Sequence, residues 1–530
     1  MIAVNQAGYE IGAAKHATIT GGGRYRLCKA SGEVVLEGSA SPVYDENSGE
    51  KAGCIDFSSV DTAGTYYFED AAGKRSVTFP IKKKTYAGVF RDALRMLYFQ
   101  RCGTALKKEY AGVYAHGACH CGEGRILYSD PAERRKLKGG WHDAGDFGRY
   151  VTPGAVTIAH LLYAYLLKPK AFKQSMDIPE SGNGLPDVLN ECAWELDWIL
   201  KMQDADGGVH HKATSESFVD FIMPEDDKFE PVITPVSSLA TADTAAVMAL
   251  AARVYAEFDE KRAAKYRRCA LKAGKWLAEN QGLLFKNPSE IHTGTYEDVC
   301  DADERLWASA ELFLLTEKKE WLWSMRMILE VRLNLTALGW ADVGGLAGLA
   351  VFTAPKGAFP ADLENKFKSS WLDEAERLQK LAAANPYELA FRPYDFVWGS
   401  NMRVLCNAMV LIMAGRFSKK KEYTDTARFQ LDYVLGRNAM DTSYVTGHGE
   451  RSFMEPHNRP TVADGITDPI PGYVSGGPNY RPGDTMANPE TLKGAAPMKC
   501  YVDSWKSYST NEIAIYWNSP LVFVLALLDK

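Results

Sequence analysis

Residues 139–150 read Gly-Gly-Trp-His-Asp-Ala-Gly-Asp-Phe-Gly-Arg-Tyr, and the rest of the chain is interpreted outward from this stretch. It places Asp143 and Asp146 three positions apart, with only Ala and Gly between them. Small residues allow a sharp backbone turn and a close approach to a ligand. Both carboxylates can then face one space in which water is held against a substrate. Taken alone, the pair is a weak signal that a turn or a calcium loop explains more simply, and the neighbouring Trp141 suits either a core or a sugar platform.

A second informative segment, residues 508–518, reads Tyr-Ser-Thr-Asn-Glu-Ile-Ala-Ile-Tyr-Trp-Asn. Its lone charged residue, Glu512, is predicted to open an otherwise apolar helix. An isolated carboxyl in apolar surroundings is unusual unless it has a function. The segment therefore strengthens a catalytic interpretation of the aspartate pair.

The composition indicates a soluble globular protein of at least two domains. Of the 530 residues, 46% are hydrophobic and 24% charged, and a chain of this length exceeds a usual single domain. With 61 Lys and Arg against 67 Asp and Glu, the net charge of −6 disfavours nucleic-acid binding. The 12 Trp and 26 Tyr can stack on sugars, although a large helical core also uses many aromatic residues.

The N-terminal residues show no basic and apolar export signal, and no run of 18 apolar residues occurs. We therefore expect no membrane partner and a cytoplasmic location, or a secreted one if a signal has been removed. The ten cysteines are scattered rather than framed as disulfide pairs, and several look like buried thiols. This pattern favours a reducing compartment.

Residues 1–83 are predicted to form a small β-sandwich. Short β-type runs recur about every ten residues and are separated by Gly, Ser and Asp turns. The predicted strands are 17–20, 24–28, 33–36, 65–68 and 76–79.

Residues 84–530 are predicted to be almost wholly helical. Apolar residues recur with a 3.6-residue period in 90–101, 156–167, 186–202, 242–258, 261–279, 303–315, 321–333, 371–384, 402–414, 423–435 and 512–528, with 341–352 as a weaker twelfth segment. Long connections at 203–240, 284–302 and 436–511 are of a length that usually indicates function. Several helices are apolar on more than one face. The layout fits a helical barrel with long loops at one end.

The sequence resembles glycoside hydrolase family 9, the inverting cellulases with an (α/α)6 barrel, in the subgroup with an N-terminal immunoglobulin-like domain. The resemblance rests on 139–146, on 443–459 ending in His457-Asn-Arg459, and on Asn511-Glu512 with its apolar continuation. Weaker similarities occur at 206–212, 303–308 and 398–401. Position 458 is Asn where many relatives have a second His, which leaves fine sugar specificity open.

The resemblance implies a role for each carboxyl group. Asp146 would be the general base, Asp143 would help to hold the attacking water, and Glu512 would protonate the leaving oxygen. Inversion needs acid and base about 6.5–9.5 Å apart so that water fits between them and the sugar. Ile513, Ile515 and Trp517 would raise the pKa of Glu512 by desolvation.

The resemblance also implies residues that bind sugar. His457 and Arg459 would donate hydrogen bonds to sugar hydroxyls, although a loop-anchoring contact is the alternative for each. The remaining predicted substrate residues are Tyr508, His211, Trp307 and Trp398.

Two metal sites are expected. Cys102, Cys119, His120 and His142 suit tetrahedral zinc, which relatives of this subgroup bind at matching positions. Cys121 and His116 compete as ligands, and a thiol pair without metal is the alternative.

Calcium is expected at Asp303, Glu304 and Asp342, with Asp298 added from its proximity. Acidic residues favoured by a helix N-terminus are the alternative explanation there.

The sequence thus predicts a mainly α protein, with an immunoglobulin-like β-sandwich at 1–83 and an (α/α)6-barrel catalytic domain at 84–530. Its expected activity is inverting hydrolysis of β-1,4-glucosidic bonds in cellulose-like glucans or cello-oligosaccharides, by a monomer. The alternatives are an exo-β-glucosaminidase acting on chitosan oligomers and a carbohydrate-binding protein without catalysis.

Overall fold

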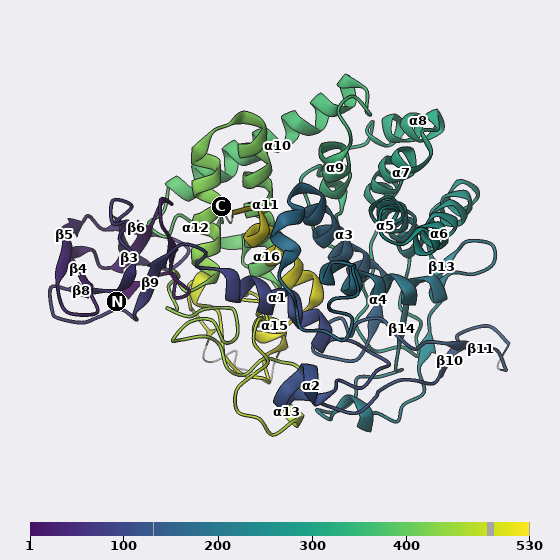
Figure 1. Cartoon of the computed structure of the whole chain (residues 1–530), viewed down its shortest axis with the longest axis horizontal. Coiled ribbons are helices and arrows are strands. Elements are labelled where there is room, and N and C mark those ends of the chain that lie inside the picture. The colour runs from purple at the N-terminus through teal and green to yellow at the C-terminus, as the bar shows by residue number, and fades with distance from the viewer. Residues whose placement is uncertain (131, 485–491, 529–530) are drawn as a thin grey trace. The chain divides into compact units, whose positions relative to one another are not determined.

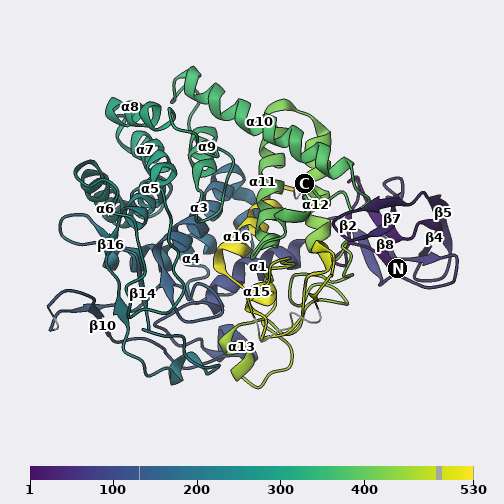
Figure 2. The same cartoon turned by 180° about the vertical axis from the view of Figure 1, so that it is seen from behind.

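The structure, a computed structural model, describes residues 1–130, 132–484 and 492–528. The chain divides into two compact units, residues 1–96, 372–461 and 466–530 in the first and residues 97–371 and 462–465 in the second. Figures 1 and 2 show the elements from opposite sides, with the N-terminal strands in purple and the last helix in yellow. Among the described residues, no helix has the length and apolar character needed to cross a membrane.

The first unit begins with a two-sheet β-sandwich. Its strands are β1 (Ile2–Ala3), β2 (Tyr9–Glu10), β3 (His16–Thr20), β4 (Gly23–Lys29), β5 (Val34–Ala40), β6 (Val43–Asp45), β7 (Glu50–Asp56), β8 (Gly64–Asp70) and β9 (Phe79–Lys82). The sheets have the orders β1-β3-β7-β6 and β2-β9-β8-β4-β5. Buried side chains of both sheets form one apolar core, in which Phe57 packs edge to face against Tyr9 and Phe68 at centroid distances of 4.9 and 5.2 Å. The predicted sandwich is confirmed.

Several strands differ from the prediction, and the short strands β1, β2 and β6 were not predicted. The strand expected at 76–79 begins at Phe79 instead, because Ser76 is already bonded to the backbone of Phe68 through its own N–H and its hydroxyl. Strand β7 was not predicted, since a glycine at its centre reads as a strand breaker. In the fold Gly53 makes a close approach possible, because a Cβ there would lie 2.8 Å from the Cβ of Ala40.

The first unit also contains α11 (Ser400–Ser418), α12 (Lys421–Val434) and α16 (Ile515–Leu528), while α1 (Ala87–Phe99) and α10 (Ala361–Ala383) cross the boundary between the units. Nearly every described residue of α16 is buried, and the helix packs against α11 and α12. Asn518 anchors it, donating to the carbonyls of Ala93 and Gly472 and accepting from the N–H of Val474. A helix so apolar is stable only inside a layer of other elements.

The second unit is built around two buried helices. Its main helices are α3 (Val151–Leu167), α4 (Asp187–Met202), α5 (Ser238–Tyr255), α6 (Glu260–Glu279), α7 (Ala302–Thr316), α8 (Lys319–Ile328) and α9 (Gly344–Thr353). Almost all side chains of α3 and α5 are buried, and α5 packs against α3, α6 and α7. Many of the α5 residues are alanines, which let neighbouring helices approach closely.

Short strands in the second unit position the aspartate loop. The order β11-β10-β15-β14-β12 comprises β10 (Glu123–Ile126), β11 (Arg134–Lys136), β12 (Arg149–Tyr150), β14 (Lys212–Thr214) and β15 (Val232–Ile233), and β13 (Val209–His210) pairs with β16 (Val236–Ser237). Strand β12 follows the loop directly and pairs with β14, which places Tyr150 opposite Lys212. These strands were not predicted, because each has at most four residues.

The remaining short helices are α2 (Lys108–Ala111), α13 (Arg459–Ala463), α15 (Tyr508–Asn511), η1 (Gly112–Tyr114), η2 (Pro169–Lys173), η3 (Pro224–Asp226), η4 (Pro393–Asp395) and η5 (Pro497–Lys499).

Two helix predictions need correction. The helix expected at 371–384 starts at Ala361, because Leu363 and Phe367 extend its buried face by two turns. The helix expected at 512–528 is interrupted. Glu512 has an extended backbone, with φ −68° and ψ 157°, between α15 and α16. It therefore does not open the apolar helix.

Candidate active site

The aspartate loop is held in place by glycine geometry and by one glutamine. Gly140 has φ 81°, and a Cβ there would lie 2.8 Å from Cγ of Trp198. The side-chain amide of Gln100 donates to the backbone carbonyls of His142 and Ala144, both at 3.0 Å. The backbone carbonyl of Gln100 accepts from the N–H of His142 at 2.7 Å. The loop backbone is therefore fixed before any ligand binds.

The two aspartates turn back on the same short loop. The N–H of Asp143 donates to the carbonyl of Gly148 at 2.9 Å, and the N–H of Gly148 donates to Oδ2 of Asp146 at 3.0 Å. Asp143 is 1% exposed and Asp146 9%. Burial raises the pKa of Asp143 well above its usual range, and the nearby Asp146 adds to the rise. The pair thus has the spacing and the electrostatic coupling of a site that handles a proton.

Tyr296 is a functional candidate that the sequence reasoning missed. Its hydroxyl donates to Oδ2 of Asp143, and this bond opposes the rise in the pKa of that carboxyl. The other oxygen, Oδ1, is buried and has no hydrogen-bond partner among the described residues. A buried carboxylate oxygen in this state is suited to accept a hydrogen bond from a bound water. No sequence signal identified Tyr296 in its long loop.

His211 contacts the backbone of Tyr296. It has no exposed surface, its Nε2 lies 3.1 Å from the carbonyl oxygen of Tyr296, and its Nδ1 lies 2.9 Å from the Ser237 hydroxyl. Its ring stacks on Phe285 with a centroid distance of 3.8 Å. Burial lowers the pKa of His211 to about 3, so the ring is neutral. His211 contacts Tyr296, and Tyr296 in turn contacts Asp143.

A buried lysine lies near the same loop. Nζ of Lys212 donates to Oδ1 of Asn287 at 2.7 Å and to the carbonyl of Gly294 at 2.5 Å. Burial lowers the pKa of Lys212 to about 7, and attraction to Asp146 works against this decrease. The lysine thus ties the loop that carries Tyr296 to β14.

Two tryptophans take core positions. Trp141 donates its backbone N–H to Glu195 at 2.6 Å and its indole N–H to Glu191 at 3.3 Å, so the core alternative describes it. Trp307 is 0% exposed, and its indole N–H donates to the Tyr163 hydroxyl at 2.8 Å. This burial gives no support to the predicted sugar contact of Trp307.

Glu512 lies in the first unit, on an extended segment tied to two neighbouring loops. Its carbonyl accepts from the N–H of Gly476 at 2.8 Å, and it forms a parallel bridge with His457. The adjacent Asn511 accepts the N–H of His457 at 2.9 Å through its backbone carbonyl. Ile513 and Trp517 are buried as expected. The rise in the pKa of Glu512 stays a prediction.

Aromatic rings extend from the neighbourhood of Glu512 to the surface. The Tyr508 ring lies 6.1 Å from that of His457 and 5.5 Å from that of Trp398. Nδ1 of His457 lies 2.6 Å from the carbonyl oxygen of Trp505, which fixes the ring. Trp398 is 52% exposed, as a sugar platform requires. Arg459 is buried at the start of α13.

The four predicted zinc ligands come together. Single ligand atoms of Cys102, Cys119, His120 and His142 all lie within 4.8 Å of one another. Sγ of Cys102 is 3.6 Å from Nδ1 of His120, and Sγ of Cys119 is 3.9 Å from Nε2 of His142. Two sulfurs and two imidazole nitrogens at these separations fit a tetrahedral zinc ion.

The surroundings of this cluster complete the fit. Nε2 of His120 lies 3.1 Å from Oδ2 of Asp227, the carboxylate partner that metal-bound imidazoles usually have. The competing candidates face other groups. Nδ1 of His116 lies 2.7 Å from the carbonyl oxygen of Gly117, and the Cys121 thiol donates to backbone carbonyls.

The acidic residues predicted to bind calcium also fit a cation. Burial and mutual repulsion raise the pKa values of Asp298, Asp303, Glu304 and Asp342, the last to about 7. Oδ2 of Asp298 and Oε2 of Glu304 are buried and have no hydrogen-bond partner among the described residues. Buried carboxylate oxygens without donors are the ligands that a hard cation prefers.

Asp243 is a further acid of this cluster that the sequence did not reveal. It is fully buried on α5, and neither of its carboxylate oxygens has a hydrogen-bond partner in the part of the chain that the structure describes. Burial raises its pKa, and repulsion from Asp303 and Asp298 raises it further. The sequence signal that could have indicated Asp243 is that it is the one acidic residue in an alanine-rich helical segment. Asp301, by contrast, pairs with Arg305 at 2.9 Å.

Comparisons with known proteins cover both parts of the chain. Residues 86–525 match glycosyl hydrolase family 9, and residues 1–75 match the cellulase N-terminal ig-like domain. A cellodextrinase of Butyrivibrio fibrisolvens is 41% identical over 99% of both chains.

Two solved structures show the same likeness. A single mutant of the thermostable endoglucanase from Alicyclobacillus acidocaldarius superposes with a TM-score of 0.93 at 36% identity, covering 100% of this chain and 99% of that one. A zinc-binding triple mutant of a family 9 endoglucanase gives 0.92 at 32%, covering 99% of both. The chain therefore has a helical (α/α)6-barrel domain after its immunoglobulin-like domain.

Proposed function

Because this chain belongs to glycosyl hydrolase family 9, it is a glycoside hydrolase of β-1,4-glucans, and we propose that it cleaves short cello-oligosaccharides with inversion. The preference for short oligomers is supported by the similarity to a cellodextrinase along nearly the whole of both chains. A hydrolase of this kind must activate water on one side of the sugar and protonate the leaving oxygen on the other.

In the proposed reaction Asp146 accepts a proton from water as the water oxygen attacks the anomeric carbon. Asp143 holds that water through the buried Oδ1, the oxygen left without a partner when Tyr296 donates to Oδ2. Glu512 gives its proton to the glycosidic oxygen as the bond to the anomeric carbon breaks. The products are a new hydroxyl at the cleaved end and a sugar of inverted anomeric configuration. The proposal depends above all on the unpartnered Oδ1 of Asp143.

We further propose that His457, Arg459, Tyr508 and Trp398 bind the sugar. An exposed indole beside Tyr508 supplies an apolar surface on which a pyranose ring can stack, and the imidazole and guanidinium can bond hydroxyls.

Zinc at Cys102, Cys119, His120 and His142 would be structural, since all four positions of a tetrahedral ion are filled by protein. His142 precedes Asp143 directly, so this cluster would stiffen the aspartate loop. Calcium, or a similar hard cation, would neutralise Asp243, Asp298, Asp303, Glu304 and Asp342.

Product analysis tests the assignment. Wild-type protein should convert cellotetraose to shorter cello-oligosaccharides whose new reducing end is initially the α-anomer, detected by proton NMR. Glu512→Gln should lower the rate about 10²–10⁴-fold. Products from glucosamine oligomers but not from cellotetraose would overturn the substrate proposal, and an initial β-anomer would overturn inversion.

A further inference from the structure

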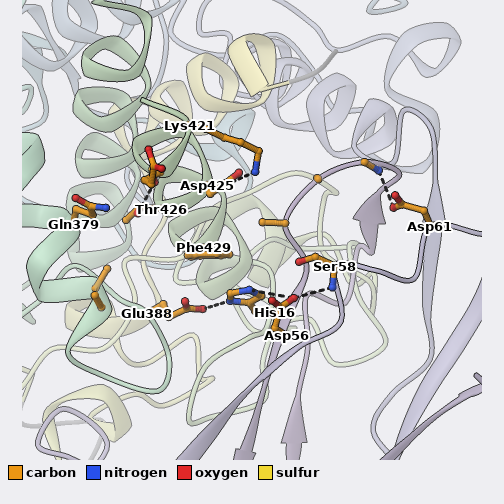
Figure 3. A pocket seen from close by; sticks show the side chains of 16 residues that line it. His16, Asp56, Ser58, Asp61, Gln379, Glu388, Lys421, Asp425, Thr426 and Phe429 are labelled. Atoms are coloured by element: carbon orange, nitrogen blue, oxygen red, sulfur yellow. Dashed lines mark hydrogen bonds and ion pairs between the residues drawn. The ribbon is translucent and has the colours of Figure 1, made fainter. Parts of the chain in front are cut away.

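A second group of metal-ligating side chains lies in the first unit, apart from the residues assigned above. His16 on β3 and Cys54 on β7 belong to adjacent antiparallel strands, in which His16 is opposite Asp56. Because side chains alternate along a strand, Cys54 and Asp56 project from the same face of β7 as their neighbour His16. Glu388, from the loop after α10, meets this face (Figure 3).

Two of the three distances within this group match those around a tetrahedral ion. Sγ of Cys54 is 3.7 Å from Nδ1 of His16 and 3.6 Å from Oε2 of Glu388. Ordinary zinc bond lengths and a tetrahedral angle place sulfur about 3.5 Å from a nitrogen or oxygen ligand. Nδ1 of His16 and Oε2 of Glu388 are hydrogen bonded at 2.6 Å and would separate to about 3.3 Å around an ion.

The outer partners of His16 also suit a metal-bound imidazole. Its second nitrogen, Nε2, lies 3.6 Å from Oδ1 of Asp56, as in a carboxylate–histidine–metal arrangement. The Phe429 ring stacks on it at a centroid distance of 4.4 Å and 20° between planes. The imidazole is thus oriented with Nδ1 toward Cys54 and Glu388.

A cavity of about 510 Å³ opens onto the group, lined among others by His16, Asp56, Glu388 and Phe429 (Figure 3). Ions and water can therefore reach His16 and Glu388 from this cavity. Glu388 has φ 50°, a conformation rare for residues other than glycine, which the fold must stabilise. That backbone turn brings its carboxylate to the two strands.

We propose that His16, Cys54 and Glu388 form a second metal site, which takes zinc or a cation of similar softness with solvent in the fourth position. On binding, the Cys54 thiol loses its proton to solvent and its sulfur bonds the ion. The imidazole bonds through Nδ1 and carries its proton on Nε2, toward Asp56. A thiolate, an imidazole and a carboxylate are donors that zinc accepts together.

The local charges balance in the loaded site. Nη1 of the fully buried Arg437 lies 2.7 Å from Oε2 of Glu388 and brings a positive charge. The thiolate, the Glu388 carboxylate and the Asp56 carboxylate together offset this guanidinium and a divalent ion. Without the ion, Glu388 keeps its ion pair with Arg437 and the Cys54 thiol is neutral, so Asp56 is left as the one carboxylate of this count without a compensating charge.

Zinc content tests the proposal in the full-length protein. The chain is stripped with a chelator, equilibrated with buffered zinc, and measured by elemental analysis. Cys54→Ala should hold one zinc ion fewer per chain than the wild type. Cys28→Ala, which removes a buried thiol of the same domain outside the group, should hold as many as the wild type. This difference does not depend on whether Cys102, Cys119, His120 and His142 are loaded.

A second measurement uses unaltered protein, so that a folding defect in Cys54→Ala cannot obscure the result. Zinc should slow alkylation of Cys54 by iodoacetamide about tenfold or more, as followed by peptide mass spectrometry. Calcium is kept in excess so that zinc does not occupy the acidic cluster around Asp298, and alkylation of the exposed Cys300 should then not change. Equal zinc content in wild type and Cys54→Ala, or alkylation of Cys54 at the same rate with and without zinc, would overturn the proposal.

Discussion

The loop at 139–150 and the segment at 508–518 each present carboxyl groups, but they hold them in different ways. Asp143 is buried, receives a hydrogen bond from Tyr296, and follows His142, one of the four predicted zinc ligands. Glu512 is half-buried and positioned by backbone bonds to Gly476 and by its bridge to His457. The first arrangement fixes side-chain atoms, whereas the second fixes the main chain.

This difference agrees with the work proposed for each region. A base must hold a water molecule in one place, which requires fixed oxygen atoms and a controlled pKa. An acid must have its carboxyl within reach of the leaving oxygen during bond cleavage, and a backbone held by hydrogen bonds keeps that carboxyl in position. Each prediction below tests one side of this contrast.

The largest effect is expected when the base is removed. Asp146→Asn should lower kcat on cellotetraose about 10³–10⁴-fold, because no other group takes the proton from water. Azide needs no base and should restore part of the turnover, leaving a glycosyl azide detectable by mass spectrometry.

Glu512→Gln is the matched control. It should gain nothing from azide on cellotetraose but should hydrolyse a cellobioside with an acidic phenol leaving group at nearly the wild-type rate, since that leaving group needs no proton. If the two variants respond alike to azide and to the activated substrate, the assignment of base and acid to these regions fails.

Tyr296→Phe removes the hydrogen bond that holds Asp143. A bond to a charged group contributes about 1.5–3 kcal/mol, so kcat/KM should fall about 10–150-fold. Because the lost bond lowers the pKa of Asp143, that pKa should rise, and the acidic limb of the pH–rate profile should move to higher pH. Tyr128→Phe, at an exposed tyrosine, should change neither quantity. An unchanged profile in Tyr296→Phe would show that Asp143 is not controlled in this way.

The acidic cluster should make the metal-free protein sensitive to pH. Burial raises the folded-state pKa values of its members, to about 7 for Asp342, so their contribution to stability is present at low pH and is lost as pH rises through these values. With EGTA, the unfolding temperature should therefore fall between about pH 5 and 7.5, by roughly 1–2 °C for each kcal/mol lost. Added calcium should remove most of this decrease.

Asp243→Asn should flatten the same dependence, because it removes one buried charge of the cluster. Two results would contradict the cation site. One is an unfolding temperature that rises from pH 5 to 7.5 in EGTA, and the other is an unfolding temperature at pH 7.5 that does not change when calcium is added.

The smallest effect is expected at the sugar platform. Trp398→Ala should raise KM for cellotetraose about 2–12-fold with little change in kcat, since one aromatic contact is worth about 0.5–1.5 kcal/mol. Trp307→Phe should instead lower the unfolding temperature and leave KM unchanged, because that indole has no exposed surface. If Trp307→Phe raised KM and Trp398→Ala changed only the unfolding temperature, then Trp307 would contact the sugar and Trp398 would have a structural role.

The sequence predicted most elements whose apolar pattern is long. The eleven clear helical segments and the weaker twelfth all correspond to helices, with shifted ends. The four residues predicted to bind zinc also lie close together. Short elements were missed, since β12 and β14 have two and three residues and their pairing depends on distant strands. The position of Glu512 between two helices was also not predicted, because Ile513 and Ile515 are as compatible with an apolar helix as with a buried extended segment.

By itself, then, the sequence determined the fold class and the carboxyl groups to consider, since periodic apolar residues and motif residues are local properties of the chain. Only the tertiary structure decided which partners those groups have. Tyr296 and His211, 85 positions apart, meet behind Asp143, and Asp243 joins acids more than fifty positions away. Such contacts depend on how buried helices and long loops pack, and burial is what changes the protonation and the ligand chemistry of these side chains.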